Sequence, residues 1–448
     1  MSFNNEVVQL NNISAQAPRM SWNSLLCHAR LHPKPPVDSP ERSAFEVDYD
    51  RLIFSKAFRR LARKTQVHPL AVNDHTHNRL THSLEVASVG RSFGKAAYYI
   101  AKAHEKRNIP GDAIEFAELI QAACLAHDIG NTPFGHAGER SIRQWMNANP
   151  ACLSNLSAAQ KSDLTLYEGN AQAFRIATRS VSEFESGCIN RQGGLGLTAA
   201  TLATMMKYPW HSNHPYAQAH GKYSVFQEDS SAFEWVANET GLLYNDDAYC
   251  RHPLAFLVEA ADDICNAIID IEDAIELNIL QREEIEHALM QLSGLPATSP
   301  IAQMRAKAIG MLITQCLQIF DDNYNDIMQG QFQTPLIQLI DKAMFEAFSH
   351  LNTTAQNQVY PFQQDEHLEQ SCNLTLARIL SETMQSTISV DLGKPDIVTE
   401  PFLEFFTNAL KKNNAGYERC MMTMDFVAGM TDNYAVNLAD RLEMASHD

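Results

Sequence analysis

Two histidines and two aspartates stand out in the sequence because their chemistry suits the binding of one divalent metal ion. They are His82, the adjacent pair His127 and Asp128, and Asp262, and each falls in a segment whose pattern predicts a helix. Imidazole nitrogens and carboxylate oxygens without cysteine are ligands for Mn²⁺, Mg²⁺, Fe²⁺, Ni²⁺ and Zn²⁺, and the pattern does not choose among these metals. A site of this kind indicates a hydrolase.

Helices must bring these side chains together. Apolar residues recur at helical spacing in 80–93 and place His82 on the buried face of that helix. The segment 113–129 places His127 on its apolar face, and Gly130 is a plausible stop after it. Because Asp128 is adjacent to His127, an ion just beyond the last turn is within reach of both.

A third helix is predicted over 254–277. It is apolar at first and then carries a polar stripe at spacings of four, four and three residues, formed by Asp262, Asn266, Asp270 and Asp273. Buried carboxylates are costly without a cation or donors, so this stripe predicts a partner.

Each candidate ligand also has a plainer interpretation. A lone histidine such as His82 is more often a core side chain bonded to a carbonyl, and an adjacent His-Asp pair can be a polar helix end. Asp262 alone could instead pair with Arg79 or Arg251. The joint occurrence of all four residues favours the metal.

Longer strings carry a resemblance to a known family. In this order they occupy residues 54–67, 79–86, 126–139, 167–172, 197–210, 259–264 with 270–274, and 425–434. With this set the chain resembles the HD-domain phosphohydrolases, and among them the bacterial dGTPase branch of the deoxynucleoside triphosphate triphosphohydrolases. The resemblance implies a mainly α fold, with an HD-domain helical phosphohydrolase core and a C-terminal helical extension.

The resemblance also implies roles for individual residues. The four metal candidates match the family's ligands, and His136 with Glu139 matches its pair beside the attacking water. Their spacing of three at a helix start would let the carboxylate orient the imidazole, although a helix cap with a surface glutamate is the plainer alternative. The residues that resemble its substrate-binding set are Arg79, Lys207, Tyr208 and Lys222 for phosphate and Asp270 for the sugar 3′-hydroxyl.

Asn266 departs from the family pattern. Many relatives carry a tyrosine four residues after the metal-binding aspartate, where the ring is thought to pack on the deoxyribose and exclude a 2′-hydroxyl. Asparagine at this position predicts looser sugar selection or an altered base preference.

The implied reaction is hydrolysis at the α-phosphorus of a deoxynucleoside triphosphate, which releases deoxynucleoside and tripolyphosphate, with dGTP as the first substrate to test. Two alternatives stay open. One is another HD phosphohydrolase that acts on nucleoside monophosphates, cyclic nucleotides or alarmones. The other is a non-catalytic regulator that binds dNTPs or DNA.

Composition and the positions of helix-interrupting segments predict the organisation of the chain. With 448 residues and 45% hydrophobic content, it can bury a large core. We expect an irregular segment over 1–40, the HD core over 41–292, and a C-terminal helical region over 301–448 that packs on the core. Strand signals are few, such as 358–362.

The remaining signals concern environment and partners. Nine cysteines without a CxxC pair predict reduced thiols in a cytoplasm, and no long apolar run predicts a membrane span. A net charge of −18 argues against broad nucleic-acid binding. A local basic face, expected on one helix, is formed by Lys56, Arg59, Arg60, Arg63 and Lys64. By resemblance, single-stranded DNA, an allosteric dNTP and a homo-oligomer, specifically a hexamer, are the partners to test.

Overall fold

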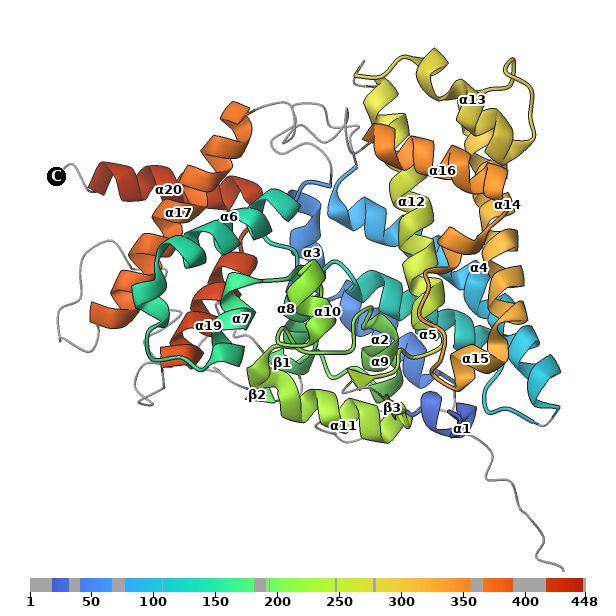
Figure 1. The fold of residues 1–448 in the computed structure, drawn as a ribbon, viewed down its shortest axis with the longest axis horizontal. Coiled ribbons are helices and arrows are strands. Elements are labelled where there is room, and N and C mark those ends of the chain that lie inside the picture. The colour runs from blue at the N-terminus through green and yellow to red at the C-terminus, as the bar shows by residue number, and fades with distance from the viewer. Residues whose placement is uncertain are drawn as a thin grey trace, which may run out of the picture.

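The computed structural model describes residues 18–31, 41–66, 77–106, 108–180, 191–192, 194–245, 248–276, 279–355, 366–389 and 416–445. Within these ranges the chain is mainly helical, which confirms the predicted fold class (Figure 1). Two short antiparallel strand pairs are the only sheets in these ranges, and they pair Arg179 with Gln192 and Tyr244 with Tyr249. The strand signal at 358–362 lies outside the described residues.

The first half of the chain contributes α1 (Trp22–Leu25), α2 (Ala44–Ile53), α3 (Lys56–Arg60), η1 (Leu61–Arg63), α4 (Arg79–Glu105), α5 (Ala113–Ala126), α6 (Gly135–Ala148), η2 (Pro150–Leu153), α7 (Ala158–Thr165), α8 (Gly169–Thr178), β1 (Arg179–Ser180), β2 (Arg191–Gln192), α9 (Ala199–Met205) and α10 (Pro215–His220). The second half contributes η3 (Gln227–Asp229), α11 (Ser230–Thr240), β3 (Tyr244–Asn245), β4 (Ala248–Tyr249), α12 (Ala255–Glu276), α13 (Arg282–Ser293), α14 (Ile301–Asp322), α15 (Tyr324–Met328), η4 (Leu336–Leu339), α16 (Lys342–Thr354), α17 (Glu366–Ser389), α19 (Gly416–Ala428) and α20 (Asp432–Ala445).

Helices α4 and α5 pack closely because glycines face the contact. A Cβ atom at Gly94 would lie 2.5 Å from the Cα atom of Ala117, and one at Gly90 would lie 2.6 Å from the Sγ atom of Cys124. Any larger side chain at either glycine would push the two helices apart. This close packing fixes the relative positions of the candidate ligands that the two helices carry.

Local signals explain where these helices begin. Asn78 caps α4 by accepting hydrogen bonds from the backbone of Leu80 and Thr81, and Asp112 caps α5 in the same way. The structure ends α5 at Ala126, so the predicted helix over 113–129 is three residues too long. The predicted helix over 254–277 differs from α12 by one residue at each end.

The buried side chains form two hydrophobic clusters. The larger one joins α4, α5, α9 and α12 with α14 and α16, and the smaller one joins α6 and α7 with α17, α19 and α20. Figure 1 shows this grouping, with α17, α19 and α20 beside α6 and α7, and α13, α14 and α16 near α12. The boundary near residue 300 is a loop between α13 and α14, while the domain division expected there stays a prediction.

Asp432, at the start of α20, ties the C-terminal helices to the loop before α6. Its carboxylate accepts hydrogen bonds from the backbone nitrogen of Phe134 at 2.9 Å and from the backbone nitrogen and hydroxyl of Thr65 at 3.0 and 2.7 Å. Phe134 has a φ angle of +62°, which is uncommon for a residue with a side chain. The bond to Asp432 therefore stabilises a strained turn.

Lys64 makes a second tie between the same regions. Its buried ammonium group donates to the backbone carbonyls of Asn131 and Ala428, the latter at 2.6 Å. Burial lowers the pKa of Lys64 well below its usual value.

In the described part of the chain, no helix has both the length and the apolar composition needed to cross a membrane.

Candidate active site

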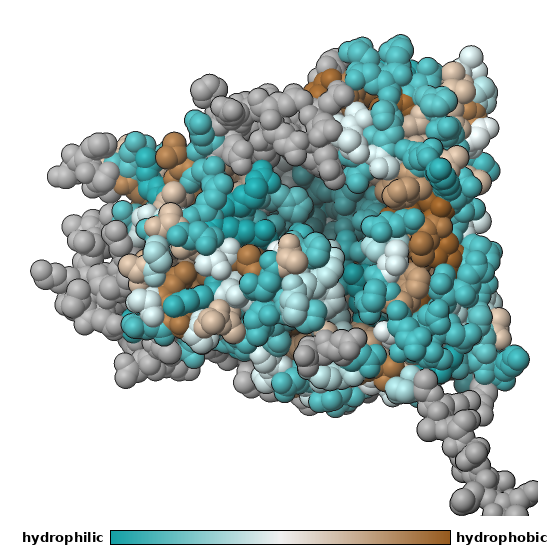
Figure 2. All heavy atoms as spheres, viewed as in Figure 1, coloured by the Kyte–Doolittle hydropathy of each residue, from teal (hydrophilic) through white to brown (hydrophobic). Residues whose placement is uncertain are grey.

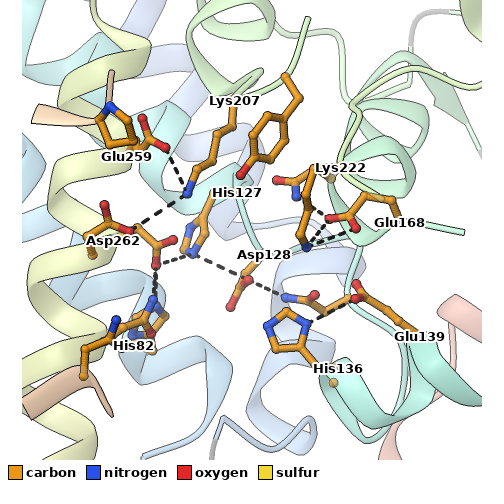
Figure 3. Close-up of a pocket in the computed structure, with 18 of the residues that line it drawn as sticks. His82, His127, Asp128, His136, Glu139, Glu168, Lys207, Lys222, Glu259 and Asp262 are labelled. Atoms are coloured by element: carbon orange, nitrogen blue, oxygen red, sulfur yellow. Dashed lines mark hydrogen bonds and ion pairs between the residues drawn. The ribbon is translucent and has the colours of Figure 1, made fainter. Parts of the chain in front are cut away.

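Three predicted metal ligands meet in one group. His82 comes from the first turn of α4, His127 follows the last residue of α5, and Asp262 lies in α12. One nitrogen or oxygen atom from each lies within 4.8 Å of the other two, and the side chains point toward one another (Figure 3). Helices from distant parts of the sequence thus assemble two imidazoles and a carboxylate.

The hydrogen bonds of the two rings fit a metal. The Nδ1 atom of His127 bonds to the carbonyl oxygen of Cys124 at 2.5 Å, while its Nε2 atom is buried without a hydrogen-bond partner. The Nε2 atom of His82 lies 3.2 Å from Asp262, and its Nδ1 atom is buried and unpartnered. The ring of His127, fixed at Nδ1 with Nε2 turned toward carboxylates, has the usual arrangement of a metal-binding histidine, and His82 turns its Nε2 atom toward Asp262.

The local charge also suits a cation. Burial lowers the pKa of His127, but the carboxylates of Asp128 and Asp262 outweigh it and raise that pKa to about 9. Burial raises the pKa of Asp262, yet the neighbouring histidines hold it well below its usual value. The two aspartates thus favour positive charge between the rings, and the residues present fit a divalent metal.

Asp128 lies beside this group without completing it. Its Oδ1 atom is 3.5 Å from the Nε2 atom of His127 and accepts a hydrogen bond from Asn131, and its Oδ2 atom accepts from Arg79 at 2.9 Å. Asp128 as a fourth ligand stays a prediction. Because Arg79 pairs with Asp128, it is not the partner of Asp262 that the plainer interpretation required.

His136 and Glu139 form the predicted pair at the start of α6. The Nδ1 atom of His136 lies 3.1 Å from Glu139, whose other oxygen accepts from the backbone nitrogen of Gly169 at 3.0 Å. Glu139 is buried and His136 is exposed, so the alternative of a surface glutamate is wrong. Burial raises the pKa of Glu139, but the bond to His136 and nearby cations lower it. The glutamate stays ionised and can orient the ring.

The predicted phosphate-binding lysines each lie beside a buried glutamate. Lys222 contacts both carboxylate oxygens of Glu168, at 3.0 and 3.1 Å. Lys207 lies 3.3 Å from Glu259. Burial lowers the pKa of each lysine and the facing carboxylates raise it, with a net increase, so both lysines carry charge. Figure 3 shows the two ammonium groups on the side of the site away from His82.

Arg251 is a third cation beside the two lysines. Arg251 donates to Glu259 at 2.6 Å, and its guanidinium carbon lies 5.6 Å from the ring centre of Tyr208. The Nε atom of Arg251 is buried without a partner. Arg251, Glu168 and Glu259 were not predicted as site residues, although the two glutamates lie within the strings 167–172 and 259–264 that carry the resemblance.

The polar stripe of α12 is anchored beside the metal group. Asn266 donates to Asp262 at 2.8 Å and accepts from Gln66 at 3.0 Å, and the Oε1 atom of Gln66 is buried without a partner. The amide of Asn266 thus lies beside Asp262, at the position where the resemblance predicts a tyrosine. The side chains of Asp270 and Asp273 lie outside the described part of α12.

All of these groups line one cavity of about 760 Å³. Figure 2 shows a hydrophilic hollow on the face of the molecule seen in Figure 1. The cavity continues to side chains from the loop before η4, from η4 itself and from α16, which are Gln333, Pro335, Ile337, Gln338, Phe345, Phe348 and Asn352. Predicted metal ligands, cations and an apolar wall with amides therefore share one space, which suits a nucleotide.

The basic face predicted around α3 is confirmed only in part. Lys56, Arg59, Arg60 and Arg63 line a second cavity of about 540 Å³ together with residues of α19 and α20. Lys64 was wrongly placed on this face. Helix α3 ends at Arg60 and is followed by a 3₁₀ turn, after which Lys64 adopts an extended backbone conformation and points inward to its carbonyl partners.

Comparisons with known proteins agree with this geometry. A family model described as the HD domain matches residues 79–152. The chain is 37% identical over 444 residues to a protein of Pseudomonas aeruginosa named deoxyguanosinetriphosphate triphosphohydrolase-like protein, with 94% of this chain and 98% of the relative covered. A protein of the same name from Synechocystis is 36% identical, with 94% and 99% covered. A deoxyguanosinetriphosphate triphosphohydrolase from Yersinia pestis is 27% identical, with 90% and 94% covered.

Proposed function

Because this chain belongs to the deoxyguanosinetriphosphate triphosphohydrolase-like family of HD-domain proteins, we propose that it hydrolyses deoxynucleoside triphosphates at the α-phosphorus. The products are a deoxynucleoside and tripolyphosphate, and dGTP is the first substrate to test. The observation that carries this proposal is the shared cavity, in which the group of His82, His127 and Asp262 faces two lysines and the His136–Glu139 pair.

A divalent metal held by His82, His127 and Asp262, with Asp128 beside it, supplies Lewis-acid chemistry at a phosphoryl oxygen. Mn²⁺ and Mg²⁺ are the first metals to test, followed by Fe²⁺, Ni²⁺ and Zn²⁺. The chemistry of one carboxylate and two imidazoles is compatible with all five.

The protein's own groups carry the rest of the reaction. His136 accepts a proton from water at its Nε2 atom while Glu139 holds Nδ1 and stabilises the charged ring. Lys207 and Lys222, with Arg79 behind Asp128, neutralise the charge on the triphosphate while water bonds to the α-phosphorus and the bond to the 5′-oxygen breaks. The 5′-oxygen takes up a proton and leaves with the deoxynucleoside, and the tripolyphosphate keeps the α-phosphorus. The apolar wall at Phe345 and Phe348 receives the nucleoside.

Sugar selection is the part of this proposal in which this chain is expected to differ from its family, because of Asn266. Asn266 and Gln66 present amides beside Asp262, where a tyrosine would present a ring. An amide can bond to a hydroxyl group and occupies less volume, so we expect a 2′-hydroxyl to be tolerated. Asp270 is proposed to bind the 3′-hydroxyl.

Partners beyond the substrate stay predictions. We propose the basic cavity at Arg59 and Arg63 as the surface that meets single-stranded DNA or an allosteric dNTP, because its cations suit phosphate and its walls include Phe426 and Tyr434. A hexamer in the cytoplasm is the assembly and location to test.

One experiment tests the reaction. The purified protein is incubated with Mn²⁺ and each of the four dNTPs or GTP, separately and in mixtures, and the phosphorus products are resolved by ³¹P NMR. Tripolyphosphate supports the proposal and ranks the bases, while cleavage of GTP supports the assignment of Asn266. Orthophosphate or pyrophosphate would indicate another HD phosphohydrolase, and binding without any product would indicate a regulator.

A further inference from the structure

Glu168 is shared between two cations of unequal mobility. It accepts from the Nζ atom of Lys222 at 3.0 and 3.1 Å and from the Nη2 atom of Arg143 at 2.9 Å. Arg143 is held separately, since its Nε atom donates to the carbonyl of Tyr167 at 2.7 Å. Side-chain exposure is 1% for Glu168 and 33% for Lys222, so the glutamate is buried at the cavity lining while the lysine extends into the cavity.

Glu259 repeats this arrangement at a second place in the lining of the cavity. It lies 3.3 Å from Lys207 and accepts from Arg251 at 2.6 Å. The guanidinium group of Arg251 is held between aromatic rings, 5.6 Å from the centre of Tyr208 and 5.1 Å from that of Phe256. Here too the glutamate is buried and the lysine is partly exposed to the cavity.

Each glutamate thus forms a triad with one lysine and one arginine, Lys222–Glu168–Arg143 and Lys207–Glu259–Arg251. In each triad the arginine still neutralises the charge of the glutamate when the lysine turns away. A lysine is a point charge on a flexible stem, whereas both arginines are fixed by a second contact. The lysine can therefore exchange its glutamate for a phosphate oxygen without leaving a buried carboxylate unpaired. The same carboxylate also repels an approaching polyanion and competes with it for the lysine.

We propose that Glu168 and Glu259 are positioning residues that compete with polyphosphate for the two lysines and pair with the lysines again when polyphosphate departs. This inference rests on the proposed function and assigns part of it, the release of tripolyphosphate. Loss of the negative charge should increase the affinity for polyphosphate, whereas loss of a purely structural glutamate would decrease that affinity by misplacing the lysine.

The test measures binding of inorganic tripolyphosphate to the full-length, Mg²⁺-loaded protein by isothermal titration calorimetry. Glu168→Gln should lower the Kd for tripolyphosphate on the order of tenfold, because it removes one negative charge beside the site. Glu168→Asp, which keeps the charge, should restore an affinity close to that of the unmodified protein. An unchanged or higher Kd for a folded Glu168→Gln protein would overturn the proposal.

A double-mutant cycle locates the effect. In a Lys222→Met background, Glu168→Gln should no longer tighten binding, since the lysine that it releases is absent. An equal tightening in that background would contradict the assignment. Glu228→Gln is the matched control, because Glu228 also pairs with buried arginine, at 2.9 Å from Arg175, but does not line the cavity.

A second variant and a binding assay that needs no turnover make the result independent of folding and of catalysis. If Glu168→Gln does not fold, as judged by its circular dichroism and melting transition, Glu259→Gln tests the same prediction at the second triad. Binding of tripolyphosphate does not require turnover. Failure to release tripolyphosphate from any dNTP would therefore overturn the proposed function, while the Kd series alone decides the role of the two glutamates.

Discussion

His127 is a predicted metal ligand whose buried Nε2 atom faces two carboxylates, so we expect metal binding to depend on it directly. We expect His127→Ala and Asp128→Ala each to lose bound metal and turnover together. Metal content after dialysis against Mn²⁺, measured by mass spectrometry, and the rate of tripolyphosphate release check this. His104→Ala is the control, since His104 pairs with Asp321 outside the cavity. Turnover that survives in either purified site variant would remove the assignment.

Glu139 should separate metal binding from proton transfer. Glu139→Ala removes the acceptor that orients His136 but leaves the three clustered ligands in place. We expect normal metal content and a kcat lower by about 10²- to 10⁴-fold, the usual contribution of a positioned acid or base. The same two measurements apply, and a metal-free Glu139→Ala protein would contradict this division of roles.

Asn266 should control the choice between deoxyribose and ribose. We expect Asn266→Tyr to lower kcat/KM for GTP relative to dGTP by about tenfold or more, because a ring would fill the space beside the sugar. Competition between the two nucleotides measures this ratio. Asn266→Ala is the companion variant, since it removes the amide without adding a ring. An unchanged ratio in Asn266→Tyr would show that sugar selection lies elsewhere.

Residue types and spacing predicted the metal candidates, and the family resemblance predicted the lysines and the His136–Glu139 pair, but neither predicted how the side chains of this cavity pair with one another. Four metal candidates, two lysines and the His136–Glu139 pair were identified, and the structure places all of them along one space. The two triad glutamates were missed, because the partner of Glu168 is 54 residues away and periodicity does not indicate which cation a buried carboxylate meets.

Helices were predicted well where apolar residues recur at helical spacing over many residues, and poorly where this spacing is interrupted. The helices around His82 and Asp262 follow from their spacing, and α5 ends three residues early because His127 already leaves the helical ladder. Lys64 was misplaced because the switch from an α-helix to a 3₁₀ turn rotates every following side chain. Such a switch carries no clear sequence signal.

The start of α20 should matter to both stability and turnover. We expect Asp432→Ala to lower the free energy of unfolding by about 2–4 kcal/mol, because it leaves a buried donor on Phe134 and two partly buried donors on Thr65 without an acceptor. Turnover should fall as well, since Phe134 lies between Asp128 and His136 in the chain. Urea unfolding and the tripolyphosphate assay measure these effects.

Asp440 supplies the matched control for that prediction. It lies on the same helix but is exposed, so Asp440→Ala should change the free energy of unfolding by no more than about 0.5 kcal/mol. Equal effects of the two substitutions would mean that the loss reflects the helix itself rather than its tie to the loop before α6.

The fold as a unit should lose stability in mild acid through His252. This ring is fully buried between Leu25 and Thr204, and burial lowers its pKa from 6.5 to about 4. The unfolded chain therefore binds the proton first as the pH falls below 6.5. The stabilising contribution of the neutral ring, up to about 3 kcal/mol, is present above pH 6.5 and is lost between pH 6.5 and 4.

Unfolding by urea at a series of pH values tests this, with His252→Gln as the reference. Glutamine carries no charge in this range, so the difference in unfolding free energy between the two proteins should shrink as the pH falls. A difference that is independent of pH would show that His252 does not titrate in the folded state as expected.

The arrangement of the whole chain was predicted less fully than its parts. Composition and motifs indicated a helical core with a C-terminal region packed on it. The hydrophobic clusters pair α6 and α7 with α17, α19 and α20, and place α14 and α16 with the central helices. Which helices share a core depends on contacts between residues hundreds of positions apart, and no local pattern encodes these.

The bond between Asp432 and Phe134 also has a consequence during protein synthesis. The two residues are separated by 298 positions. At a translation rate of about 5–20 residues per second, the loop before α6 waits roughly 15–60 seconds on the ribosome before its acceptor is made. Until then the nascent chain has its metal-ligand helices but not the bond that stabilises the turn between them and His136. We therefore expect the catalytic centre to mature only after residue 432 has left the exit tunnel.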